Sequence, residues 1–175
     1  MPSKKAKATT EETVTVAPPI SIEEVTVKNK DSLETIVVEE LWKIESDLTV
    51  LGFDVPADNK VIDILCNDHN GQLVILMLSI NEDDTMLFEG LQTLNEVNRV
   101  RPMLRYFNKD QKINDKEPAR LILVAPSFST NMLTIATGIS NVRISLYAWE
   151  YLQFGESKAL RVTPISLSEA FKNRK

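Results

Sequence analysis

Apolar residues recur along this chain at two different spacings, and the changes between them mark the predicted elements. From residue 31 to residue 51 they stand three and four positions apart, which predicts one amphipathic helix. Asp31 suits the N-cap of this helix, and Glu34 follows three positions later, as in a capping box. A second helix is predicted at 84–100, and Pro102 is expected to end or kink it.

A hairpin between these helices is the expected centre of the core. From Val61 to Ile80 the sequence reads V-I-D-I-L-C-N-D-H-N-G-Q-L-V-I-L-M-L-S-I. Two apolar runs flank Asn70-Gly71, a strong signal for a tight turn, and strands are expected at 60–66 and 72–80. The second apolar run is uncharged and apolar on both faces, which is typical of a central strand covered by helices.

The rest of the chain alternates strands and helices. A short apolar run at 119–126 is typical of a buried parallel strand, and a helix capped by Ser127 or Ser129 follows it. Two more strands are predicted at 141–149 and 159–165, the last of them at a sheet edge because it contains a proline. This order predicts an α/β fold with a mixed central β-sheet flanked by helices.

Residues 1–30 differ in composition from the rest of the chain. Lysines, threonines and a Pro18-Pro19 pair dominate them, so we predict a flexible or extended N-terminal arm before a single α/β domain at 31–175. Two interpretations of the arm stay open. Composition favours a solvated tail, whereas the alternating stretch at 20–27 would suit an arm that docks on a partner or on a second copy.

Charge and composition limit the classes of function. A net charge of -5 argues against a broadly basic nucleic-acid-binding surface, although not against a local basic patch. One cysteine, Cys66, and one histidine, His69, exclude an intramolecular disulfide and a zinc site built from nitrogen and sulfur ligands. No apolar run approaches the roughly 18 residues of a membrane span. Because no apolar segment follows the N-terminal lysines, we expect a cytoplasmic protein.

The hairpin and the order of elements resemble the PD-(D/E)XK, or restriction-endonuclease-like, superfamily, whose core has the order αβββαβ. The resemblance runs from about Asp31 to Leu152 and centres on the hairpin, where the family carries a metal-binding aspartate and an E-x-K element. The family's site positions fall here on Glu34, Asp63, Met77, Ser79 and Gln92. Met77 replaces the acidic residue of E-x-K and Ser79 replaces its lysine, so the resemblance implies the fold with a degenerate catalytic motif.

The two replaced charges decide the expected chemistry. Such nucleases hold Mg²⁺ between two carboxylates, and the lysine stabilises the charge of the transition state. The thioether of Met77 is too soft a ligand for Mg²⁺, and one remaining carboxylate does not make a phosphodiesterase centre. We therefore expect no catalytic residue, no metal, no cofactor and no enzymatic activity, and we interpret the five matching residues as a vestigial site.

Polar residues near this site have explanations other than catalysis. Asp63 is expected to be partly buried beside a hydrogen-bonding partner, with a raised pKa if Met77 shares its face. Glu34 suits a helix cap, and the acidic run at 82–84 suits a helix start, displaced metal ligands being the alternative for both. His69 is expected to be an exposed turn residue.

A local basic cluster follows the second helix, with Tyr106 inside it. It provides the candidate contacts to phosphate or to a partner: Arg99, Arg101, Arg105 and Lys109. The same helix carries Glu89 and Glu96, so a solvated face or an acidic protein partner explains the cluster equally well.

The sequence leaves three alternative functions open. The first is a catalytically inactive nuclease-fold domain that serves as a structural or protein-interaction module, with a protein partner or self-association through the arm. The second is a nucleic-acid-binding accessory protein that keeps the DNA groove without cleavage. The third is a Mg²⁺-dependent nuclease with migrated ligands, which requires Glu34 or a residue of 82–84 to lie close to Asp63.

Overall fold

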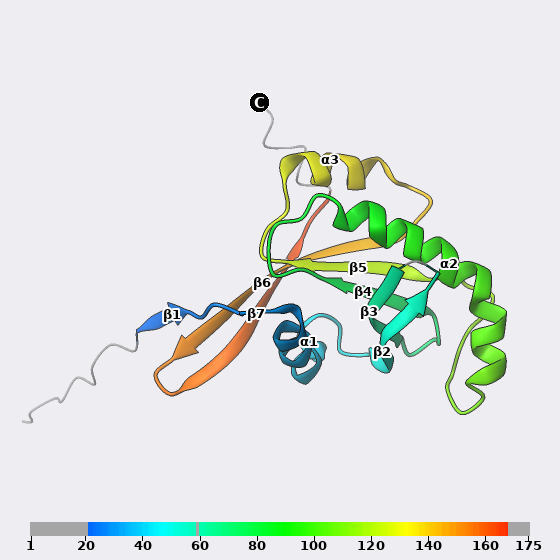
Figure 1. Ribbon diagram of the computed structural model, residues 1–175, viewed down its shortest axis with the longest axis horizontal. Helices are drawn as coiled ribbons and strands as arrows, with labels where there is room; N and C mark the ends of the chain where they lie inside the picture. The colour runs from blue at the N-terminus through cyan, green and yellow to red at the C-terminus, as the bar shows by residue number, and fades with distance from the viewer. Residues whose placement is uncertain (1–20, 59, 168–175) are drawn as a thin grey trace, which may run out of the picture.

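Within the described part of the chain, seven strands form one mixed sheet, and three α-helices cover its two faces (Figure 1). The computed structural model describes residues 21–58 and 60–167. In chain order the elements are β1 (Ile22–Glu24), α1 (Lys30–Glu39), a 3-10 turn (Leu41–Lys43), β2 (Thr49–Ala57), β3 (Lys60–Asn67), β4 (Leu73–Leu78), α2 (Met86–Phe107), β5 (Arg120–Ala125), α3 (Thr130–Gly138), β6 (Ile144–Phe154) and β7 (Ser157–Ile165).

The strand order explains where the helices lie. The sheet runs β1-β6-β5-β4-β3-β2, and β7 pairs with β6 outside this path. Strands β2, β3 and β4 form an antiparallel meander, whereas β4, β5 and β6 are parallel and are joined through α2 and α3. The predicted mixed α/β fold, with a helix-flanked sheet and a restriction-endonuclease-like order, is therefore confirmed.

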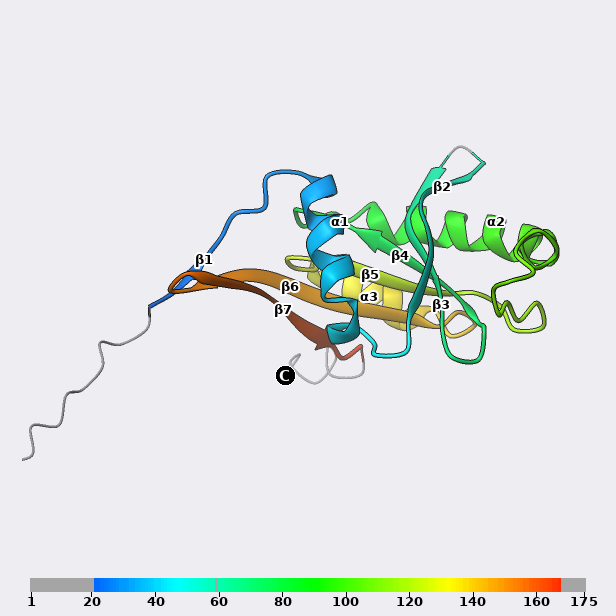
Figure 2. The same ribbon diagram turned by 90° about the horizontal axis from the view of Figure 1, so that it is seen from below.

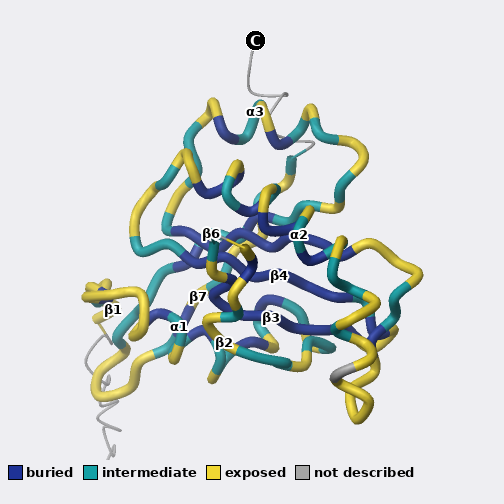
Figure 3. Tube along the Cα trace, turned by 45° about the vertical axis from the view of Figure 1, so that its right-hand side comes forward, coloured by how far each residue is buried: buried dark blue, intermediate teal, exposed yellow. Residues whose placement is uncertain are grey.

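Two apolar cores lie on opposite faces of the sheet. Strands β4 and β5 are buried along their whole length. Figure 3 shows β4 in dark blue. Ile75 and Met77 face the core beneath α2 and α3, while Val74 and Leu76 face the core beneath α1. Figure 2 shows α1 and α3 on opposite sides of the sheet. Burial on both faces explains why these strands are almost uncharged.

The first predicted helix is wrong beyond its first half. Helix α1 ends at Glu39, a 3-10 turn follows, and β2 begins at Thr49. Thr49 pairs with Asn67 and Val50 with Cys66, so pairing with β3 overrides the helical spacing of the apolar residues. The N-cap is also Asn29 rather than Asp31, because the Asn29 side chain accepts a hydrogen bond from the backbone N–H of Ser32.

The second helix is longer than predicted. Pro102 lies inside α2, which continues to Phe107. Proline removes one backbone hydrogen bond and crowds the preceding turn, which bends a helix. Figure 1 shows the last turns of α2 running at an angle to the rest of the helix.

The longest strand extends beyond the body of the sheet. The first half of β6 pairs with β5, and its last residues pair with β1. Strand β7 pairs with β6 over its whole length, from Leu146↔Ile165 to Phe154↔Ser157. Figures 1 and 2 show β1 and the β6–β7 hairpin projecting together. Residues 1–20 of the predicted arm lie outside the described residues, and Ile22–Glu24 pair with the chain's own sheet.

Cys66 provides a simple test of the packing between α1 and the sheet. Its side chain is fully buried, and burial raises the pKa of the thiol to about 12. The thiolate is the reactive form, so an alkylating reagent at mildly alkaline pH should modify Cys66 only after denaturation. Mass spectrometry of native and urea-unfolded samples measures this. Rapid labelling of the native protein would contradict the buried position.

Candidate functional site

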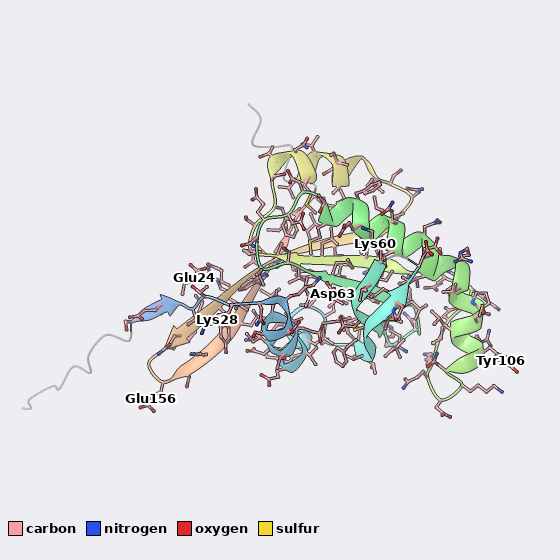
Figure 4. The ribbon with its side chains drawn as sticks, in the orientation of Figure 1. Glu24, Lys28, Lys60, Asp63, Tyr106 and Glu156 are labelled. Atoms are coloured by element: carbon pink, nitrogen blue, oxygen red, sulfur yellow. The ribbon has the colours of Figure 1, made fainter. Side chains whose placement is uncertain are left out.

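Asp63 is the acidic residue that the hairpin keeps among the five matching positions, and the structure buries it. One carboxylate oxygen, Oδ1, lies 2.7 Å from Nζ of Lys30, the first residue of α1. The other, Oδ2, accepts a hydrogen bond of 2.6 Å from the backbone N–H of Leu78. Figure 4 places Asp63 in the middle of the molecule, beside α1 and β2. The buried charge therefore has both a cation and a hydrogen-bond donor.

The hydrogen bond to Leu78 replaces part of the ladder between β3 and β4. Pairing of the two strands reaches Ile64↔Leu76 and stops there. The next N–H of β4 that points towards β3 is that of Leu78, and the Asp63 side chain accepts its hydrogen bond. A buried N–H without a partner would cost about 1–3 kcal/mol. The Asp63 side chain thus supplies a hydrogen bond between β3 and β4 at the point where the backbone pairing of the two strands ends.

Met77 and Ser79 make contacts other than those of the Asp63 carboxylate. Met77 packs in the core beneath α2 and α3, whereas Asp63 is held by Lys30 at the start of the helix on the opposite face. The Ser79 hydroxyl donates to the carbonyl of Asn81, and Trp149 Nε1 donates to the carbonyl of Ser79.

Other acidic residues surround Asp63. Burial raises the pKa of Asp63, while Lys30 and the N–H of Leu78 oppose the increase and Asp54 adds to it. The pKa of Glu34 is also raised, first by burial and then by Asp54, Asp63 and Asp31. The raised pKa expected for Asp63 is therefore confirmed in direction, with burial as its main cause.

These residues do not fit the magnesium centre of the nuclease family. Between residues 21 and 167, with residue 59 left aside, no group of three His, Cys, Asp or Glu side chains is placed to hold a metal ion. Both oxygens of Asp63 already have partners within the protein. The acidic run at 82–84 bonds elsewhere, with Glu82 accepting from Ser127 and Asp84 from Ser129. The structure therefore gives no set of ligands through which a metal-dependent step can be derived.

Gln92 belongs to a different part of the surface. It is exposed on α2 and lines a cavity of about 360 Å³ together with Lys60, Asn95 and Glu96. Lys60 forms an ion pair with Glu89 at 2.7 Å. Asp63 does not line this cavity, so the structure does not bring Gln92 to the predicted site.

The end of α2 and the following loop, residues 99–117, form what we call the basic segment. It contains six Lys or Arg residues and three Asp or Glu residues. Arg99 pairs with Glu96, and Arg105 pairs with Asp115. Arg101 donates to two neutral acceptors, the carbonyl of Asp115 and the side-chain oxygen of Asn98. Figure 4 shows Tyr106 at the far end of α2 from Asp63.

Among the residues that the structure describes, no carboxylate pairs with Lys109 or Lys112 of the basic segment. Lys112 donates to the carbonyl of His69 at 2.6 Å, and Lys109 Nζ lies 5.0 Å from the centre of the Tyr106 ring. His69 itself is exposed in the turn, as predicted, and pairs with Asp47. The basic segment therefore lies beside the β3–β4 turn and is more extensive than the predicted cluster.

Sequence reasoning missed Lys30 and Lys112. The predicted arm, residues 1–30, includes Lys30, although a carboxylate among aliphatic residues requires a cation nearby, and the start of a neighbouring helix can supply one. Lys112 lies in a polar loop, where nothing in the local pattern places it against the hairpin turn. Both contacts join residues that are distant in the sequence, 30 to 63 and 112 to 69.

Asp63 should make stability depend on pH in a defined direction. Because its pKa is raised, the folded protein holds the Asp63 proton more tightly than the unfolded chain does. This contribution to the free energy of unfolding should decrease as the pH rises from the ordinary value through the raised one. Asp63→Asn removes the titrating group and keeps an acceptor for Leu78. Urea denaturation of both proteins across the acidic range measures the difference, and identical pH profiles would contradict this assignment.

Comparisons with known proteins now give the fold its context. No protein-family model matches the sequence, and no curated protein matches it. A repair endonuclease from Pyrococcus abyssi is similar at 18% identity and a TM-score of 0.44, over 67% of this chain and 46% of the endonuclease. A structure of EndoMS with double-stranded DNA is similar at 18% identity and a TM-score of 0.45, over 72% and 47%. SfsA of Pyrococcus furiosus with Ca²⁺ is similar at 12% identity and a TM-score of 0.39, over 74% and 62%.

These comparisons correct two expectations. The similar solved structures include repair endonucleases, and nothing in the comparisons indicates an inactive protein-interaction module. The interpretation as a catalytically inactive structural or interaction module is therefore wrong, and so is the expectation that the chain is not an enzyme. A protein partner has no support either. Among the described helices, none is long and apolar enough to cross a membrane.

The similarity covers only part of each of these known proteins. The chain spans about half the length of the two endonucleases and 62% of SfsA. Sequence identities between 12% and 21% limit the likeness to the fold. The strand order and the flanking helices of the chain itself support the predicted restriction-endonuclease-like fold.

Proposed function

We propose that this chain is a nucleic-acid-binding protein with a restriction-endonuclease-like fold, and that the basic segment is its contact surface. The observation that carries the proposal is the charge of residues 99–117, where Lys and Arg outnumber Asp and Glu two to one in a chain of net charge -5. Contacts of Lys and Arg with phosphate supply most of the affinity for nucleic acid that is independent of sequence.

The hydrogen bonds of the basic segment support this role. Arg101 and Lys112 are held by neutral oxygens, so their positions are fixed while their charges stay uncompensated by a bonded carboxylate. Preorganised side chains lose less conformational entropy when they bind a ligand. Arg99 and Arg105, in contrast, are paired with carboxylates and should contribute less.

Tyr106 favours contact with unpaired bases. Its side chain is 66% exposed on the last turns of α2, and Lys109 lies over its ring. An exposed aromatic ring among basic groups lets a base stack while the neighbouring phosphates meet cations. We therefore expect single-stranded nucleic acid to bind more tightly than a duplex.

Fluorescence anisotropy with labelled oligonucleotides tests the proposal. Single strands of about 20 nucleotides and the matching duplex are titrated at about 50 and 200 mM salt, and affinity should fall steeply between the two. A log–log slope of about -2 to -4 is expected if three to five phosphates are contacted. No binding at the lower salt concentration, or binding that is independent of salt, would overturn the proposal.

Cleavage is measured in the same samples. Incubation of the labelled single strand and duplex with Mg²⁺ and with Mn²⁺, followed by gel analysis, separates binding from hydrolysis. Cleavage that is lost in Asp63→Asn would belong to this chain, because a contaminating nuclease is unaffected by the substitution. A cytoplasmic location stays a prediction.

A further inference from the structure

An apolar groove lies between α2 and α3, away from both Asp63 and the basic segment. It has a volume of about 200 Å³ and is lined mainly by Leu87, Phe88 and Leu91 of α2 and by Met132 and Ile135 of α3. Phe88 is 64% exposed and Ile135 is 52% exposed. A cavity of about 150 Å³ lined by such side chains accommodates a benzene ring. The groove therefore has room for one aromatic side chain.

One end of the groove is acidic. Asp84 lines it, and Glu82 and Asp83 precede it in the chain. Their hydrogen-bond donors are neutral: Ser127 for Glu82, Ser129 for Asp84 and Thr85 for Asp83. Within the part of the chain that the structure describes, none of these three carboxylates forms an ion pair. The groove thus combines an apolar centre with a negative end, which suits an apolar side chain followed by basic residues.

The chain's own C-terminal segment has this composition and starts beside the groove. Leu167 packs against the core beneath α2 and α3, and its carbonyl accepts a hydrogen bond from Thr137 of α3 at 3.3 Å. Residues 168–175 read S-E-A-F-K-N-R-K. Phe171 is the one large apolar residue of this segment, and three basic residues follow it: Lys172, Arg174 and Lys175.

The distances allow the segment to reach the groove. Four residues separate Leu167 from Phe171, which gives a reach of about 13–14 Å. Thr137, which holds Leu167, lies five residues along α3 from Met132, or about 7.5 Å along the helix axis. We propose that residues 168–175 bind in the α2–α3 groove, with Phe171 between Phe88 and Ile135 and the basic residues against the acidic end.

Disulfide trapping in the full chain tests this proposal. Asn131 lines the groove and Asn173 lies two residues after Phe171, so Asn131→Cys with Asn173→Cys places two thiols together without changing an anchor or a charge. Cys66 does not interfere, because it is buried and burial raises its thiol pKa to about 12. Under a mild oxidant an intramolecular disulfide should form rapidly and at a rate independent of protein concentration.

Two control variants decide the outcome. Asn95→Cys with Asn173→Cys places the first thiol on an exposed part of α2 outside the groove, and Phe171→Ser added to the test pair removes the apolar anchor. Both should cross-link at least about tenfold more slowly, since docking raises the effective concentration of one thiol near the other. Equal rates in test and control would overturn the proposal. Cross-links formed mainly between chains would overturn it too, by assigning the groove to a second copy.

Discussion

Replacing Glu45 with alanine should lower the free energy of unfolding by about 3–5 kcal/mol, the largest effect expected for a single substitution in this protein. The Glu45 carboxylate accepts hydrogen bonds from both terminal nitrogens of Arg120, at 2.8 and 2.5 Å. The Arg120 side chain is 1% exposed, and its Nε has no partner among the described residues. Removing Glu45 therefore leaves a buried guanidinium without its counter-charge.

Two further proteins separate this cause from a general loss of packing. Glu45→Leu combined with Arg120→Met removes both charges and should recover most of the lost stability, because apolar replacements avoid the desolvation cost. Glu150→Ala breaks the exposed pair with Arg161 and should cost at most about 1 kcal/mol. Urea denaturation of the four proteins measures these differences. A Glu45→Ala protein as stable as Glu150→Ala would contradict the structural role of the buried pair.

Reversing two charges of the basic segment should have the largest effect on binding. Lys109 and Lys112 lie in this segment, and neither is paired with a carboxylate in the described structure. Lys109→Glu with Lys112→Glu should weaken binding to single-stranded DNA by at least about tenfold and reduce the magnitude of the salt slope by about 1.4, at about 0.7 per lost phosphate contact. Salt titrations followed by fluorescence anisotropy give both quantities.

A control variant carries the same change in net charge on a part of the surface far from the basic segment. Lys28 precedes α1, and Lys158 lies on β7 near the tip of the projecting hairpin. Figure 4 shows Lys28 on the hairpin side of the molecule and Tyr106 at the opposite end. Lys28→Glu with Lys158→Glu should change affinity only through the net charge. If both double variants lose affinity equally, binding does not depend on the basic segment.

The local parts of the fold were predictable because their signals are local. Asn70-Gly71 closes the β3–β4 hairpin, and Gly71 has the positive φ of 82° that glycine adopts readily. A side chain at this position would meet the carbonyl of Lys112 at 2.8 Å, so the turn requires glycine for its surroundings as well. The uncharged run from Leu73 to Leu78 likewise predicted a strand covered on both faces, and all six residues are buried.

The features that the sequence pattern did not predict depend on contacts between residues that are distant in the sequence. The predicted helix includes Thr49 and Val50, but their pairing with β3 makes them strand. Lys30 was assigned to the arm, although it begins α1 and pairs with Asp63. Lys112 meets the turn at His69 across 43 positions. Sequence spacing describes one element at a time and does not show which elements become neighbours.

The most direct test of the central claim is hydrogen–deuterium exchange of the full chain with and without a saturating single-stranded oligonucleotide. We expect slower exchange of backbone amides within residues 99–117 and at the neighbouring β3–β4 turn, with the β6–β7 hairpin unchanged. Protection confined to the hairpin, or no protection at a concentration where anisotropy reports saturation, would contradict the assignment of nucleic-acid binding to the basic segment.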